Sequence, residues 1–145
     1  LLFPAVYVPD SNERILLYRE LDSLTNSKEI DAFKVRMQDR FGAIPKEGEE
    51  LIRVVTMRHK AQKLGIEKIY LKGGRMNLLL VDTRNERYYT SELFGGIMSY
   101  IPTSPFKCKV REGDGRCIIT VENVKRVETA LAFVEEIERH SIAPC

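Results

Sequence analysis

The segment DRFGAIP, residues 39–45, constrains the fold of this chain more than any other stretch. Large apolar residues lead into it at steps of three and four, the spacing that puts side chains on one face of an α-helix. These residues are Ile30, Phe33, Met37 and Phe41. Gly42 has no Cβ and adopts positive φ at little cost, so it suits the position just past a helix end. Pro45 disfavours helical geometry at Ile44 and fits the first turn of a new helix. The segment therefore predicts two helices joined at a glycine turn, with Phe33, Met37 and Phe41 buried.

Helix start and stop signals surround this segment. Asp10 suits a helix N-cap, and Glu13 three residues later completes a pair that resembles a capping box. The polar run at residues 25–27 ends that helix and caps the next one. A third helix is expected over residues 47–64, and an extended strand or arm over residues 1–9. The first half of the chain is therefore predicted to be helical.

After residue 65 the pattern changes to short apolar runs separated by glycine turns. The turn sequences KGGR at 72–75 and EGDG at 112–115 each lie between two such runs, which is typical of β-hairpins. Helical patterns follow each hairpin, at residues 91–101 and after an expected cap at Asn123. Gly95 and Gly96, inside the first of these, favour close helix packing over a nucleotide site. The order is hairpin, helix, hairpin, helix.

These elements predict an α+β fold, in which N-terminal helices precede a four-stranded, mostly antiparallel sheet packed with helices in a ββαββα-like order. We expect one domain over residues 1–145, with a helical half at about 10–65 and a hairpin-and-helix half at about 66–142. A chain of 145 residues, 43% hydrophobic, buries a sufficient core without a metal or disulfide.

Charge and cysteine usage narrow the class of protein. The 23 basic and 21 acidic residues give a formal net charge of +2, too small by itself to indicate nucleic-acid binding. Cys108, Cys117 and Cys145 are odd in number and show no Cys-x-x-Cys spacing, which favours inert thiols in the reducing cytoplasm. No apolar run approaches membrane length, so no membrane association is expected. The opening Leu1, instead of Met, suggests a piece of a longer protein.

Catalytic groups do not converge anywhere in the sequence. His59 lies between basic residues on a predicted helix, and His140 falls in the last turn of another, where the helix dipole favours a cation. Neither has a partner at the spacing that a general base or a metal site requires. Residues 73–75 lack the Gly-Lys-Ser/Thr ending of a phosphate loop. The domain is therefore predicted to have no catalytic, cofactor or metal site.

A basic stripe on the third helix suggests possible phosphate contacts. Arg53 and Lys60 are seven residues apart and share a helical face, with Lys63 nearby. No aromatic residues interleave with them, as stacking on a single strand would require. A module that binds another protein surface is the preferred interpretation.

Three motifs, taken in order, resemble one family. Residues 8–10, VPD, with Arg14 and Tyr18 resemble its Ile-Pro-Asp…Arg-Leu…Tyr opening. DRFG with Pro45 resembles its Asp-Arg-Phe-Gly-x-x-Pro, and AQKLGIEK at 61–68 resembles its Ala-x-x-Leu-Gly-Ile-x-Lys. The family is the C-terminal domain of the bacterial transcription-repair coupling factor, Mfd. Order and spacing match over residues 6–70.

The resemblance implies a domain of an ATP-dependent DNA translocase that releases stalled RNA polymerase and recruits the excision-repair protein UvrA. It places ATP and Mg in other domains of that protein. In this family the C-terminal domain folds back onto a UvrB-like N-terminal module of the same chain and masks the surface that UvrA recognises. The resemblance assigns Asp39 to this interface, together with Arg40 and Arg36. Relatives often carry an acidic residue at position 36, so the charge of the contact patch is left open.

Two functions are thus expected from the sequence. The first is a non-catalytic, autoinhibitory interaction domain of a repair translocase. The alternative is an accessory domain that contacts nucleic acid through Arg53, Lys60 and Lys63. A steep salt dependence of affinity for duplex DNA would favour the alternative, because released counterions determine that slope.

Overall fold

The computed structural model describes residues 2–142 and confirms the α+β class. The chain divides into two compact units, residues 1–56 and 57–145. The division falls inside the third helix, between Thr56 and Met57. Each unit has its own hydrophobic cluster.

The first unit is helical. Its elements are α1 (Ser11–Ser23), α2 (Ser27–Phe41) and the first part of α3 (Lys46–Lys63). Asp10 caps α1 by accepting hydrogen bonds from the backbone N–H groups of Asn12 and Glu13, as the sequence predicts. Asn26 caps α2 through the N–H of Glu29. Both caps satisfy donors that a helix leaves unpaired at its start.

The core of the first unit is built from all three helices and the segment before them. Its buried members are Phe3, Val8, Leu21, Leu24, Ile30, Phe33, Met37, Leu51, Ile52 and Val55. The prediction of a buried Phe41 was wrong in degree, because this ring is only half-buried at the edge of the cluster. The expected strand or arm at residues 1–9 was also wrong, since Tyr7 and Val8 both donate to the carbonyl of Pro4 and close a turn.

The second unit is a four-stranded antiparallel sheet in the order β1-β2-β4-β3. The strands are β1 (Ile66–Lys72), β2 (Arg75–Asp82), β3 (Cys108–Gly113) and β4 (Arg116–Glu122). The helices are α4 (Glu86–Tyr89), α5 (Glu92–Tyr100) and α6 (Val127–Ile142), with a 3-10 turn at Ile101–Thr103. The four-residue α4 was not predicted. Asn123 does not cap α6, as had been expected, because it takes a positive φ of 63° and the helix begins at Val127.

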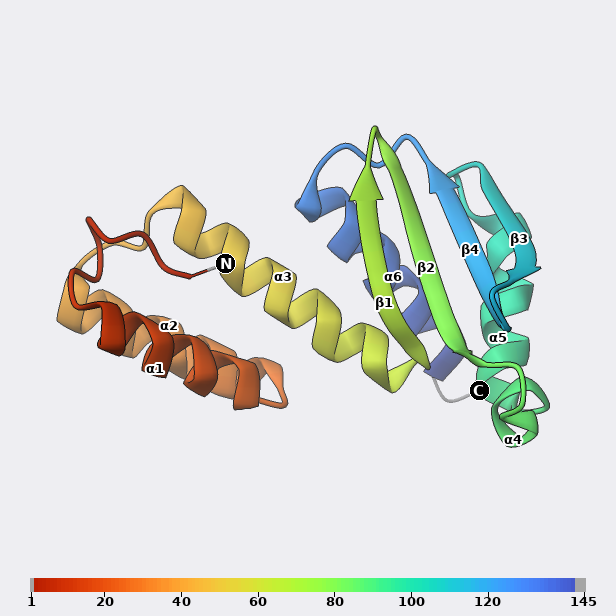
Figure 1. Ribbon diagram of the computed structural model, residues 1–145, viewed down its shortest axis with the longest axis horizontal. Coiled ribbons are helices and arrows are strands. Elements are labelled where there is room, and N and C mark those ends of the chain that lie inside the picture. The colour runs from red at the N-terminus through yellow and green to blue at the C-terminus, as the bar shows by residue number, and fades with distance from the viewer. Residues whose placement is uncertain (1, 143–145) are drawn as a thin grey trace. The chain divides into compact units, whose positions relative to one another are not determined.

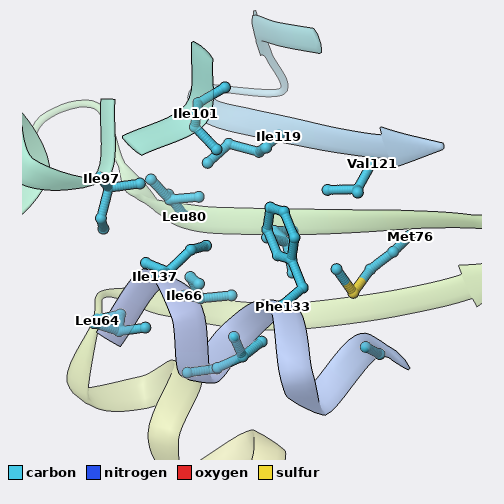
Figure 2. Close-up of a cluster of buried hydrophobic side chains, with 14 of the residues drawn as sticks. Leu64, Ile66, Met76, Leu80, Ile97, Ile101, Ile119, Val121, Phe133 and Ile137 are labelled. Carbon is cyan, nitrogen blue, oxygen red and sulfur yellow. The ribbon is translucent and has the colours of Figure 1, made fainter. Parts of the chain in front are cut away.

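One face of the sheet packs against α5 and α6 (Figure 1). Figure 2 shows Phe133 and Ile137 of α6 among strand residues that include Ile66, Leu80 and Val121. Gly96 lets α5 approach α6 closely, because a Cβ there would lie 3.1 Å from the Cα of Ser141. This agrees with the predicted packing role for Gly96, but not for Gly95, where nothing lies within 4 Å of an added Cβ.

Candidate interaction site

The end of α2 is held in place by the segment that precedes α1. The Tyr7 hydroxyl donates to the carbonyl of Gly42 at 2.8 Å and to that of Met37 at 3.2 Å. The Tyr7 ring lies 5.6 Å from the ring of Phe41. Gly42 has a φ of 87°, a conformation that favours glycine. These contacts fix the last turn of α2, and with it the backbone position of Asp39.

Arg36 and Arg40 join α2 to α1. Arg36 pairs with Glu20 and Arg40 with Glu13, each at 2.5 Å. The Arg40 guanidinium also lies over the Phe41 ring, 4.8 Å from its centroid. Both arginines are therefore engaged within the first unit, although their side chains remain 61% exposed.

Asp39 stands apart from these pairs. Its side chain is exposed and, among the described residues, has no ion pair or side-chain hydrogen bond. Val35, one helical turn earlier, is 55% exposed. Residues four apart share a helix face, so α2 presents an acidic and an apolar side chain together. We call the exposed surface formed by Val35, Arg36, Asp39 and Arg40 the α2 patch.

The basic stripe on α3 is distributed over both units. Arg53 belongs to the first unit, while Lys60 and Lys63 belong to the second. The Lys60 ammonium lies 3.1 Å from a carboxylate oxygen of Glu138 and 3.7 Å from one of Glu135. Arg53 and Lys63 also make contacts in the structure. A phosphate would have to compete with two carboxylates for Lys60. Phosphate contact by the basic stripe therefore stays a prediction.

Side chains that could bind a metal ion or act in catalysis are few elsewhere in the described part of the chain. Within residues 2–142, no three His, Cys, Asp or Glu side chains are arranged to hold a metal ion. Burial raises the pKa of the Cys108 and Cys117 thiols, which keeps both protonated. Cys145 lies outside the described residues. His140 stacks on Tyr100 and faces Glu136, 3.4 Å away, beside an open recess of about 370 Å³. None of the helices described is long and apolar enough to cross a membrane.

One cluster that the motifs did not indicate lies on the sheet. Basic residues recur along the two edge strands, four apart at positions 68 and 72 of β1 and two apart at 109 and 111 of β3. The signal in the sequence was this even spacing, which places the side chains of one strand on the same face. It became visible as one surface only when the strand order was known.

The TRCF domain family matches residues 1–91, which is more than half of the chain. The chain belongs to this family. The TRCF match includes all three motifs that carried the resemblance and confirms it.

Similarity to whole coupling factors extends beyond the TRCF motifs. The transcription-repair-coupling factor of Escherichia coli K12 is 28% identical over 144 residues, which cover 98% of this chain and 12% of that protein. That of Rickettsia prowazekii is 41% identical over 66 residues, covering 46% of this chain and 6% of the relative. The chain thus spans about an eighth or less of the lengths of these relatives.

The fold of this TRCF domain also matches a solved structure, the crystal structure of the C-terminal domain of transcription-repair coupling factor. The TM-score is 0.77 at 15% identity, with 99% of this chain and 89% of the other covered. This likeness covers the sheet as well as the helices, although the sequence resemblance stopped at residue 70. The chain is a domain of a transcription-repair coupling factor, the kind of protein associated with DNA repair coupled to transcription.

Proposed function

We propose that this domain is a non-catalytic, autoinhibitory module of a cytoplasmic ATP-dependent DNA translocase in transcription-coupled nucleotide excision repair. Its α2 patch docks on the UvrB-like N-terminal module of the same protein and masks the surface that UvrA binds. ATP and Mg bind in other domains of the protein. RNA polymerase and DNA act on this domain indirectly, through other parts of the same protein.

The observation that carries the proposal is the placement of Asp39. It lies in the last turn of α2, which ends at Phe41. The partial negative charge of a helix C-terminus disfavours a nearby carboxylate by about 0.3–1 kcal/mol. Arg40 is paired with Glu13 and does not compensate for it. An acid that contributes nothing to the stability of its own domain is well suited to meet an arginine of a partner.

The free energy needed to keep this domain docked on the N-terminal module, which we call the clamp, is small. Holding a closed state at a ratio of 99:1 takes about 2.7 kcal/mol. Removing one member of a desolvated ion pair leaves the other charge unpaired, at a cost of about 2–5 kcal/mol. The two magnitudes are comparable, so loss of Asp39 alone can open the clamp. A limited interface of this kind is also released when polymerase or DNA favours the open state.

The test is Asp39→Ala in the full-length protein, with UvrA affinity and translocase activity as readouts. Both should rise, while the melting temperature of the isolated domain stays the same or increases slightly. Asp31→Ala is the matched control, because Asp31 is another exposed acid of α2, two helical turns before Asp39 and not a member of the patch. Unchanged UvrA affinity together with a lower melting temperature would show that Asp39 acts only within its own domain.

A further inference from the structure

The face of the sheet opposite α5 and α6 is not covered by any described helix of the second unit (Figure 1). The strand register determines which side chains lie on this face and which face the core. Residues facing the core include Leu78 and Ile119, which are paired across β2 and β4. The alternate residues therefore point to the opposite face. We call this the open face.

Basic residues line both edges of the open face. On β1, Lys68, Tyr70 and Lys72 alternate with core-facing residues, and all three are exposed. On β3, the corresponding residues are Lys109 and Arg111, also exposed. The middle of the two central strands carries neutral side chains on this face, at residues 77, 79, 118 and 120. There the Thr120 hydroxyl donates to Asn77 at 2.7 Å, and Ile118 is only 3% exposed.

Acidic residues at this face form ion pairs with other arginines and do not neutralise the edge cations. Glu122 pairs with Arg75 at 3.0 Å, and Glu67 pairs with Arg116 at 3.1 Å. No carboxylate of the described residues pairs with Lys68, Lys72, Lys109 or Arg111. Unpaired cations therefore stand on both edges of one surface. The small net charge of the chain does not reveal this, because many of its acids lie on the helices.

The geometry suits a polyanion laid across strands. Four strands span about 14 Å, and the distance from Lys68 to Lys72 along β1 is about 13 Å. This is enough for a few nucleotides of an extended strand. Tyr70 lies between the two lysines on β1 and is 52% exposed. A tyrosine ring beside cations is the combination that single-stranded nucleic acid uses, with bases stacked and phosphates paired. No described helix projects from this face to enter a duplex groove.

We propose that the open face binds single-stranded nucleic acid, with phosphates on Lys68, Lys72, Lys109 and Arg111 and a base stacked on Tyr70. The residues of this surface are different from those of the α2 patch and of the α3 stripe. It adds a binding activity that the autoinhibitory role does not require.

The experiment is fluorescence anisotropy of the 145-residue chain with fluorescein-labelled oligothymidine and oligouridine, between about 50 and 200 mM salt. The two oligomers distinguish DNA from RNA. Lys68→Glu/Lys72→Glu should reduce the slope of log affinity against log salt by about 1.4, since each phosphate contact on a single strand contributes about 0.7. Lys28→Glu/Lys46→Glu changes the net charge equally at exposed positions of α2 and α3 in the first unit, and should leave the slope nearly unchanged.

Tyr70 separates stacking from charge. Tyr70→Ala should weaken binding by about fivefold or more, and Tyr70→Phe should retain it, because stacking needs the ring and not the hydroxyl. Three results of these titrations would overturn the proposal. They are absence of oligonucleotide binding at the lowest salt, equal effects of the two charge-reversal pairs, and affinity unaffected by Tyr70→Ala. Displacement of the oligonucleotide by an equal charge concentration of polyglutamate would also overturn it, and would identify a surface for acidic proteins.

Discussion

Gly65→Ala should destabilise the domain far more than an ordinary glycine substitution. Gly65 has a φ of 81°, which an L-residue adopts at a cost of about 1–2 kcal/mol. A Cβ at this position would also lie 2.5 Å from Cζ of Tyr88 and 2.8 Å from its hydroxyl oxygen. Tyr88 is only 9% exposed, and its hydroxyl donates to the carbonyl of Leu64 at 2.7 Å. Displacing the ring adds about 1–3 kcal/mol of overpacking, so the total is about 2–5 kcal/mol.

Gly73→Ala is the matched control. Gly73 has a φ of 59° in the β1–β2 turn, but nothing lies within 4 Å of the Cβ that the substitution would add. It should therefore cost only the backbone strain. Urea unfolding followed by circular dichroism measures both variants. The double variant Gly65→Ala/Tyr88→Ala should cost less than the sum of the two single substitutions, because the ring that clashes is gone. Equal costs at the two glycines would refute the explanation.

Two further predictions concern the cores. Phe33→Ala should lower the free energy of unfolding by about 3–5 kcal/mol, because Phe33 is 1% exposed, whereas Phe41→Ala at the edge of the same cluster should cost clearly less; equal losses in urea unfolding would contradict this. Burial, followed by the charge of Glu112, raises the pKa of the Cys117 thiol. The protonated thiol therefore stabilises the fold at neutral pH, and this contribution is lost as the pH rises above about 8.5, the pKa of the thiol in the unfolded chain. The melting temperature of Cys117→Ala should accordingly fall less steeply over this alkaline range than that of the wild type, and parallel curves would contradict the assignment.

The element pattern could be predicted from the sequence where local signals are strong. The two glycine turns, the caps at Asp10 and Asn26 and the glycine after α2 each leave one conformation clearly favoured. The family motifs have structural causes of the same kind. Arg14 donates to the carbonyls of Val8 and Pro9, which explains why that arginine accompanies the VPD turn.

What could not be predicted depended on distant contacts. The turn before α1 forms because Phe3 and Val8 are buried against the helices, which no local pattern shows. Asn123 carries a cap signal, but it adopts a left-handed conformation after β4 instead. The open face required the strand order, because Lys68 and Arg111 come from opposite edges of the sheet. Likewise, Asp39 is left without an ion pair because Arg40 pairs with Glu13 of α1 instead, which the sequence of α2 does not show.

The α2 patch is proposed to hold this domain against a module that UvrA also recognises. Calorimetric titration of the 145-residue chain into the separately purified UvrB-like module, with and without UvrA, measures this contact directly. We expect saturable binding that UvrA abolishes by competition, and that Asp39→Ala weakens by about 30-fold or more while Asp31→Ala does not. Simultaneous binding of UvrA and this domain, or equal affinity of the wild type and Asp39→Ala, would contradict the proposed docking.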